Sequence, residues 1–95
     1  MSCEELTAKY IASAEKMLKE LHQIKAAISV SEEDVARVLG WAADYLDDAK
    51  YYKSAGKLET SLTSVAYCEG LLDALRLLGA VKFEWPTKME KEKLS

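Results

Sequence analysis

The sequence predicts an all-α fold, an up-down-up three-helix bundle followed by an extended C-terminal tail. Apolar residues recur at spacings of three and four along three stretches, the period of an amphipathic helix. The connections between these stretches are short, which favours antiparallel neighbours. With 4 Gly and 1 Pro in 95 residues, the chain has few of the turn residues of sheet-rich domains. One small domain fits this length, so we expect the bundle over residues 1–79 and the tail over residues 80–95.

The first two predicted helices meet at Ser31. The apolar stripe of the first helix consists of Leu6, Tyr10, Ala14, Met17, Leu21, Ile24 and Ile28. Ser31 then offers a hydroxyl cap, and the carboxylates of residues 32–34 suit the positive end of a new helix. The second helix carries a wide apolar arc, and we expect neighbours on two sides of it. Its members are Val35, Val38, Leu39, Ala42, Tyr45, Leu46, Ala49 and Tyr52.

Two glycines delimit the third predicted helix. Gly56 suits the left-handed turn that ends the second helix, and Gly79 ends the third. The apolar pattern between them consists of Leu58, Leu62, Val65, Cys68, Leu71, Leu72, Leu75 and Leu78. Beyond Gly79, apolar and charged residues alternate as in an extended segment that Pro86 closes. This tail either lies across the bundle or waits for a partner chain, and we expect charged residues 87–95 to be frayed.

Charge and cysteine usage narrow the function classes. Thirteen Lys and Arg against sixteen Asp and Glu give a net charge of −3, which disfavours nucleic acid as the main partner. Cys3 and Cys68 lie far apart without a C-x-x-C spacing, and His22 is the single histidine, so we expect neither disulfide nor metal site nor cofactor. The sequence shows no signal peptide and no apolar run of membrane-spanning length. We therefore expect a cytoplasmic protein without a membrane partner.

Glu69, Asp73 and Arg76 form a polar group on the third predicted helix. At about 100° per residue the three side chains share one side of the helix. They could bind a small anionic ligand or a metal, or they could form an Asp73 to Arg76 ion pair, which is the commoner arrangement. Gly70 lies beside them, and a helical glycine there fits either close packing of another backbone or a ligand.

The aromatic residues indicate a protein contact. Trp41 lies at the edge of the apolar arc of the second helix, and Phe83 and Trp85 lie in the tail. Together they could form an exposed aromatic patch, the usual mark of a protein interface. Alternatively, the tail covers the Trp41 edge within one chain. A dimer that exchanges tails would satisfy both arrangements.

The run YLDDAKYYKSAGKLETSLTSVAYCEGLLDALRLLG, residues 45–79, resembles an archaeal family of small proteins known as domain of unknown function 357. The most specific part is residues 66–76, where the family shows a Y-x-E-G-L-L-D-x-L-R string. The resemblance implies a short three-helix bundle in an archaeal cytoplasm and an accessory role beside nucleotide-handling enzymes, without an established activity. Carried over by position, the string marks Tyr67, Glu69, Gly70, Asp73 and Arg76 as the residues to test.

These observations favour a non-enzymatic accessory or protein-interaction domain. Its partner would be another protein or a second copy of the chain, bound through Trp41, Phe83 and Trp85. The alternative is a small-ligand or metal-dependent enzyme that uses Glu69, Asp73 and Arg76. The sequence contains no recognised catalytic motif, so we expect no catalytic residue.

Overall fold

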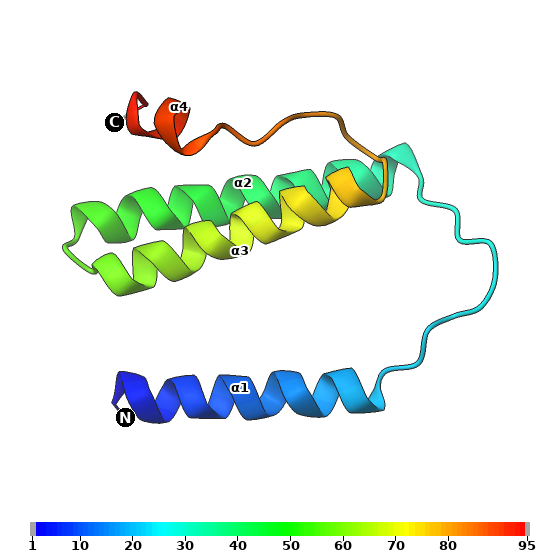
Figure 1. The fold of residues 1–95 in the computed structure, drawn as a ribbon, viewed down its shortest axis with the longest axis horizontal. Coiled ribbons are helices and arrows are strands. Elements are labelled where there is room, and N and C mark those ends of the chain that lie inside the picture. Colours follow the sequence, from blue (N-terminus) through cyan, green and yellow to red (C-terminus); the bar gives the residue numbers. More distant parts are fainter. Residues whose placement is uncertain (1, 95) are drawn as a thin grey trace.

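A computed structural model describes residues 2–94 of the chain, so the end residues of the predicted bundle and tail lie outside the described part. These residues form four helices: α1 (Cys3–Glu20), α2 (Glu32–Ser54), α3 (Leu58–Leu77) and the short α4 (Lys88–Glu92). No strand occurs among them, which confirms the all-α class. In Figure 1, α1 and α3 run in the same direction and α2 runs in the opposite one.

The hairpin of α2 and α3 is the packed part of the fold. The core consists of Ala42, Ala49, Cys68 and Leu75. Three of these side chains are small, which lets the two helices approach each other. The Ser61 hydroxyl donates a hydrogen bond of 2.6 Å to the carbonyl oxygen of Ala49, which ties the helices together near their turn.

Capping residues set the ends of the hairpin as the sequence predicts. The Ser31 hydroxyl accepts a hydrogen bond from the Asp34 amide, and the Asp34 carboxylate accepts one from the Ser31 amide. The Ser31 amide is the main reason why the pKa of Asp34 lies below its ordinary value. Gly56 ends the α2 turn at φ 76° and Gly79 ends α3 at φ 80°, left-handed conformations that favour glycine.

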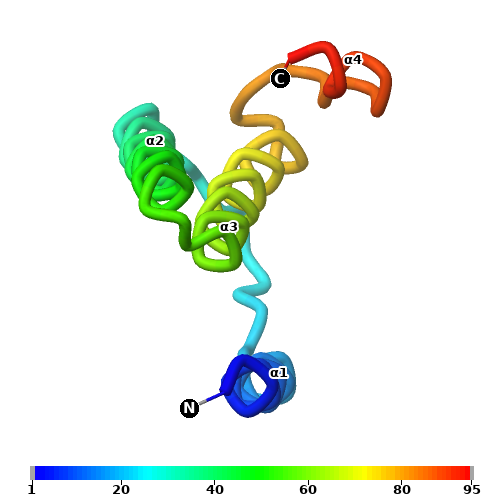
Figure 2. Tube along the Cα trace, turned by 90° about the vertical axis from the view of Figure 1, so that its left-hand side faces the viewer, coloured from blue at the N-terminus to red at the C-terminus, as the bar shows by residue number. Residues whose placement is uncertain are grey.

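The first helix differs from the prediction in its length and its packing. It ends at Glu20, and Leu21 is already extended at φ −64° and ψ 149°, so Ile24 and Ile28 lie outside the helix. These two residues are β-branched and have weaker helix propensity. Among the described residues α2 and α3 are the only two helices in contact, and α1 therefore lies apart from the hairpin as in Figure 2. The bundle contact expected of α1 is absent because an extended connection separates it from α2.

The resulting shape is open. The radius of gyration is 16.2 Å, against about 12 Å for a compact chain of this length. The accessible surface is 8437 Å², against about 5,500 Å² for a compact monomer of 10.6 kDa. About 2,900 Å² of surface therefore stays open that a closed domain would bury.

The tail returns along α3 and ends in a helix where fraying was expected. Residues 80–87 are non-helical, and α4 follows them. The Thr87 hydroxyl accepts from the Glu90 amide and the Glu90 carboxylate accepts from the Thr87 amide, so a second capping box starts this turn.

Candidate functional site

The tail is fixed to α3 by a cluster of Asp73, Arg76, Phe83 and Trp85, called here the tail-anchoring cluster. Oxygen Oδ1 of Asp73 accepts hydrogen bonds from Arg76 Nε at 3.0 Å, Arg76 Nη2 at 2.8 Å and the Trp85 indole at 2.9 Å. The Arg76 guanidinium lies 5.8 Å from the centre of the Phe83 ring. The rings of Phe83 and Trp85 pack edge to face, with their centres 4.8 Å apart. The predicted Asp73 to Arg76 ion pair is therefore present and also holds the tail.

These hydrogen bonds favour the ionised form of Asp73. The indole N–H of Trp85 is the largest cause of a pKa below the ordinary value of 3.8, followed by the hydrogen bonds from Arg76. Partial burial of the carboxylate acts in the opposite direction. The negative charge of Asp73 thus serves an internal contact and is paired with the charge of Arg76.

Glu69 and Gly70 border an open depression of about 400 Å³ beside this cluster. Asp73, Trp85 and Lys91 complete its rim together with Ala66. The side chain of Glu69 makes no hydrogen bond or ion pair with any residue from 2 to 94. A Cβ atom on Gly70 would meet no neighbouring heavy atom of residues 2–94 within 4 Å, so close packing of another backbone, one of the two alternatives for this glycine, is not found within the described part of the chain.

Tyr67 and Trp41 belong to a different surface of the hairpin. The centre of the Tyr67 ring lies 4.4 Å from the centre of the Tyr45 ring on α2. At 100° per residue, Tyr67 lies about 100° from Cys68, which faces α2, and about 120° from Asp73, which faces the tail. Trp41 precedes Tyr45 by one turn and is 51% exposed. We call this side the open face, formed by Trp41, Tyr45, Tyr52, Tyr67, Leu71 and Leu78.

The predicted site residues therefore fall into two groups. Asp73, Arg76, Phe83 and Trp85 meet at the tail, and Trp41 and Tyr67 lie on the open face. Trp41 makes no ring contact with Phe83 or Trp85. The tail thus leaves the Trp41 edge uncovered. The pairing of Tyr45 with Tyr67 was missed because sequence spacing within one helix does not show which residues of two helices meet.

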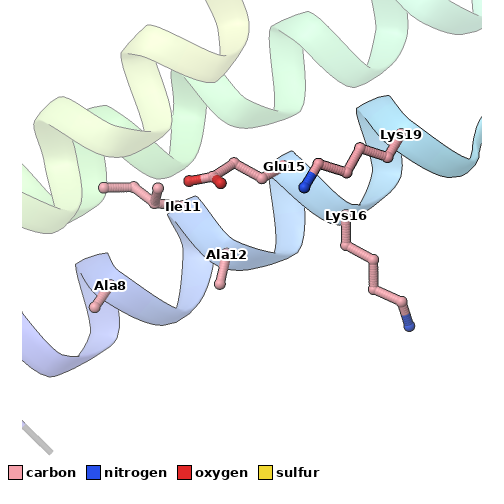
Figure 3. A pocket seen from close by; sticks show the side chains of 6 residues that line it. All are labelled: Ala8, Ile11, Ala12, Glu15, Lys16 and Lys19. Carbon is pink, nitrogen blue, oxygen red and sulfur yellow. The ribbon is translucent and has the colours of Figure 1, made fainter.

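The Cys68 thiol, the acidic side chains and the depression on α1 provide no reactive or metal-binding site among residues 2–94. Burial raises the pKa of the Cys68 thiol, and the charge of Glu69 adds to the effect, so the thiol stays protonated. Residues 2–94 contain no group of three His, Cys, Asp or Glu side chains placed to hold a metal ion. A depression on α1 is lined by one helix alone, and in Figure 3 Lys16 extends away from Glu15 and Lys19. No helix within the described part of the chain is both long and apolar enough to cross a bilayer.

Acidification tests the tail-anchoring cluster. A lowered pKa means that Asp73 stabilises the folded tail above its unfolded pKa of about 3.9, and that this contribution is lost as the pH falls through the folded value. In a Trp41→Phe chain, Trp85 is the remaining tryptophan. We expect its fluorescence to shift to the red below pH 3.8, and Asp73→Asn to show the shifted spectrum already at neutral pH. Identical spectra for the two proteins from pH 7 to pH 2 would contradict the assignment.

Gly70→Ala tests whether this glycine is needed for space. Because the position is helical and open, alanine should raise the free energy of unfolding by about 0.8 to 1 kcal/mol, or the Tm by several degrees. Gly40→Ala is the matched control, since Gly40 is also helical and without neighbours within 4 Å. Thermal unfolding followed by circular dichroism measures both. A Tm lowered by Gly70→Ala but raised by Gly40→Ala would show that an unseen neighbour occupies the site.

Comparison with known proteins adds the family. No curated protein and no solved structure shows significant similarity to the chain. The family model of DUF357, described as a protein of unknown function, matches residues 9–81, which include all of α2 and α3 and most of α1. This match covers well over half of the chain. The chain therefore belongs to the DUF357 family.

Proposed function

We propose that the chain is a non-enzymatic interaction domain whose open face binds a helix of a protein partner. The observation that carries the proposal is that few residues are buried in the core while large apolar side chains remain exposed. Four residues are buried in the core, whereas Trp41, Tyr67 and Leu78 are 51%, 54% and 75% exposed. An exposed apolar surface of this kind marks a binding site in a protein that must remain dissolved.

The anchors of the proposed contact differ from those expected of the sequence. Phe83 and Trp85 hold the tail, so Trp41 is the tryptophan that remains available to a partner. It lies beside Tyr45 and Tyr67, and tryptophan and tyrosine are the residues that most often dominate interface energetics. A helix in a groove is the mode of recognition that suits two antiparallel helices with an apolar face.

The alternative role for Glu69, Asp73 and Arg76 has less support. A ligand that engaged Asp73 and Arg76 would have to displace three hydrogen bonds and release the tail. Exposed Cys3 and buried Cys68 are both free thiols, which suits a reducing compartment, and we propose the cytoplasm. We propose that the chain acts there as an accessory domain beside a nucleotide-handling enzyme.

Capture of partners by the tagged full-length chain from its native cell extract tests the proposal. Trp41→Ala should weaken the captured complex roughly 30-fold, the effect of losing a hot-spot residue of about 2 kcal/mol. Leu62→Ala is the control, since Leu62 is 69% exposed on α3 and lies about 140° around that helix from Tyr67. Circular dichroism checks that helicity is unchanged. A partner retained equally by both variants, or no partner at all, would contradict the proposal.

A further inference from the structure

Helix α1 exposes an apolar stripe that nothing in the described part of the chain covers. Leu6, Tyr10, Met17 and Leu21 are 44%, 70%, 50% and 59% exposed. A helix in a protein owes most of its stability to the packing of its apolar face, so α1 depends on the packing of this stripe. The open face of the hairpin lacks a neighbour as well. Two unpartnered apolar surfaces therefore occur in the same molecule.

The two surfaces match in spacing. Along α1 and its C-cap residue Leu21, residues 3, 7, 10, 14, 17 and 21 follow one another at alternating steps of four and three. On α3, residues 60, 64, 67, 71, 74 and 78 do the same. Such a pattern produces the narrow seam along which two helices pack with knobs in holes. The match requires the docked α1 to run in the same direction as α3.

The paired positions also complement each other in size. In this register Ala14 lies opposite Leu71, and Met17 lies opposite Ala74. Tyr10 lies level with Tyr67, beside the ring of Tyr45. Leu21 meets Leu78 at one end, and Cys3 meets Thr60 at the other. A large residue thus faces a small one at two of the six positions, Ala14 with Leu71 and Met17 with Ala74, which favours close packing there.

The length of the connection between α1 and α2 indicates whether the open face is filled by α1 of the same chain or by α1 of another copy. Residues 21–31 are non-helical, eleven residues where bundle connections take two to eight. If a chain closed on its own α1, Leu21 would lie near the start of α2, and most of this connection would be surplus. The surplus contains Ile24 and Ile28, which are 72% and 64% exposed. Extended, the connection spans up to about 35 Å, enough to carry α1 to a neighbouring hairpin.

We propose that α1 of a second copy occupies the open face, and that two chains exchange α1 reciprocally in a symmetric dimer. The proposal rests on the open face being a docking surface, and it names the partner. The exchange covers the apolar stripe of α1 and the open face in both chains. It leaves no unpaired surface to which a third chain could add, as in isologous dimers. It also brings the two apolar connections together between the subunits. The surface left open is about 2,900 Å² per chain, or about 5,800 Å² for two chains, at the upper end of the range that obligate dimers bury.

Disulfide trapping with the native Cys3 tests the exchange. The full chain carries Thr60→Cys, and Cys68→Ala removes the other thiol. Leu62→Cys in place of Thr60→Cys is the matched control, because Leu62 lies about 160° around α3 from residue 60. Adding Cys3→Ser to the Thr60→Cys chain shows whether the bond uses Cys3. Light scattering on the unmodified chain gives the mass without any substitution.

We expect a mass of about 21 kDa, twice the 10.6 kDa of the chain. Mild oxidation should link the Thr60→Cys chain into a covalent dimer and leave the Leu62→Cys and Cys3→Ser chains largely unlinked. A dimer without this link would overturn the register, and with it the proposal. A monomer whose Cys3 bonds to the thiol introduced by Thr60→Cys in the same chain would overturn both the exchange and the open face as a docking surface. A monomer without the bond, whose partner capture still depends on Trp41, would overturn the exchange alone.

Discussion

The contact between α2 and α3 is the interaction on which the rest of the structure depends. It is made by small residues, so the helices lie close and bury little apolar area. Ala42, Ala49 and Cys68 contribute short side chains, and Ser61 adds a hydrogen bond across the contact. The long side chains of both helices consequently remain at the sides of the hairpin. A two-helix unit of this kind is stable only if another element covers those sides.

The tail covers one of these sides, and its attachment is polar. Asp73 draws Arg76 and the Trp85 indole to a single oxygen atom, and the two aromatic rings of the tail pack over the ion pair. Two of the three charged residues that the sequence groups as a candidate site, Asp73 and Arg76, therefore attach the tail, and the side chain of Glu69 takes no part in this attachment. The other side of the hairpin, around Trp41 and Tyr67, receives no such cover from residues 2–94. A helical partner there would complete a three-helix core around α3.

Sequence periodicity predicts the local structure of this chain well and its long-range packing poorly. Ser31, Gly56 and Gly79 mark the helix ends because capping and left-handed turns depend on nearby backbone groups. The Asp73 to Arg76 pair is likewise local, three residues apart on one helix. The attachment of Trp85 to Asp73 spans twelve residues and depends on the path of the tail. The apolar stripe of α1 predicts that another apolar surface covers it. The same stripe would fit a surface of its own chain or of a second copy, so the sequence does not distinguish the two.

Hydrogen exchange of the full-length chain at several protein concentrations tests the central claim most directly, that the open face is covered by another molecule. If α1 docks on a second copy, its amides should be protected, and the protection should rise with concentration. Amides of α2 and α3 near Cys68 should depend on concentration much less. Protection of α1 that is independent of concentration would mean that each chain closes on itself. Absence of protection at every concentration would mean that α1 docks nowhere, and either result would contradict the account.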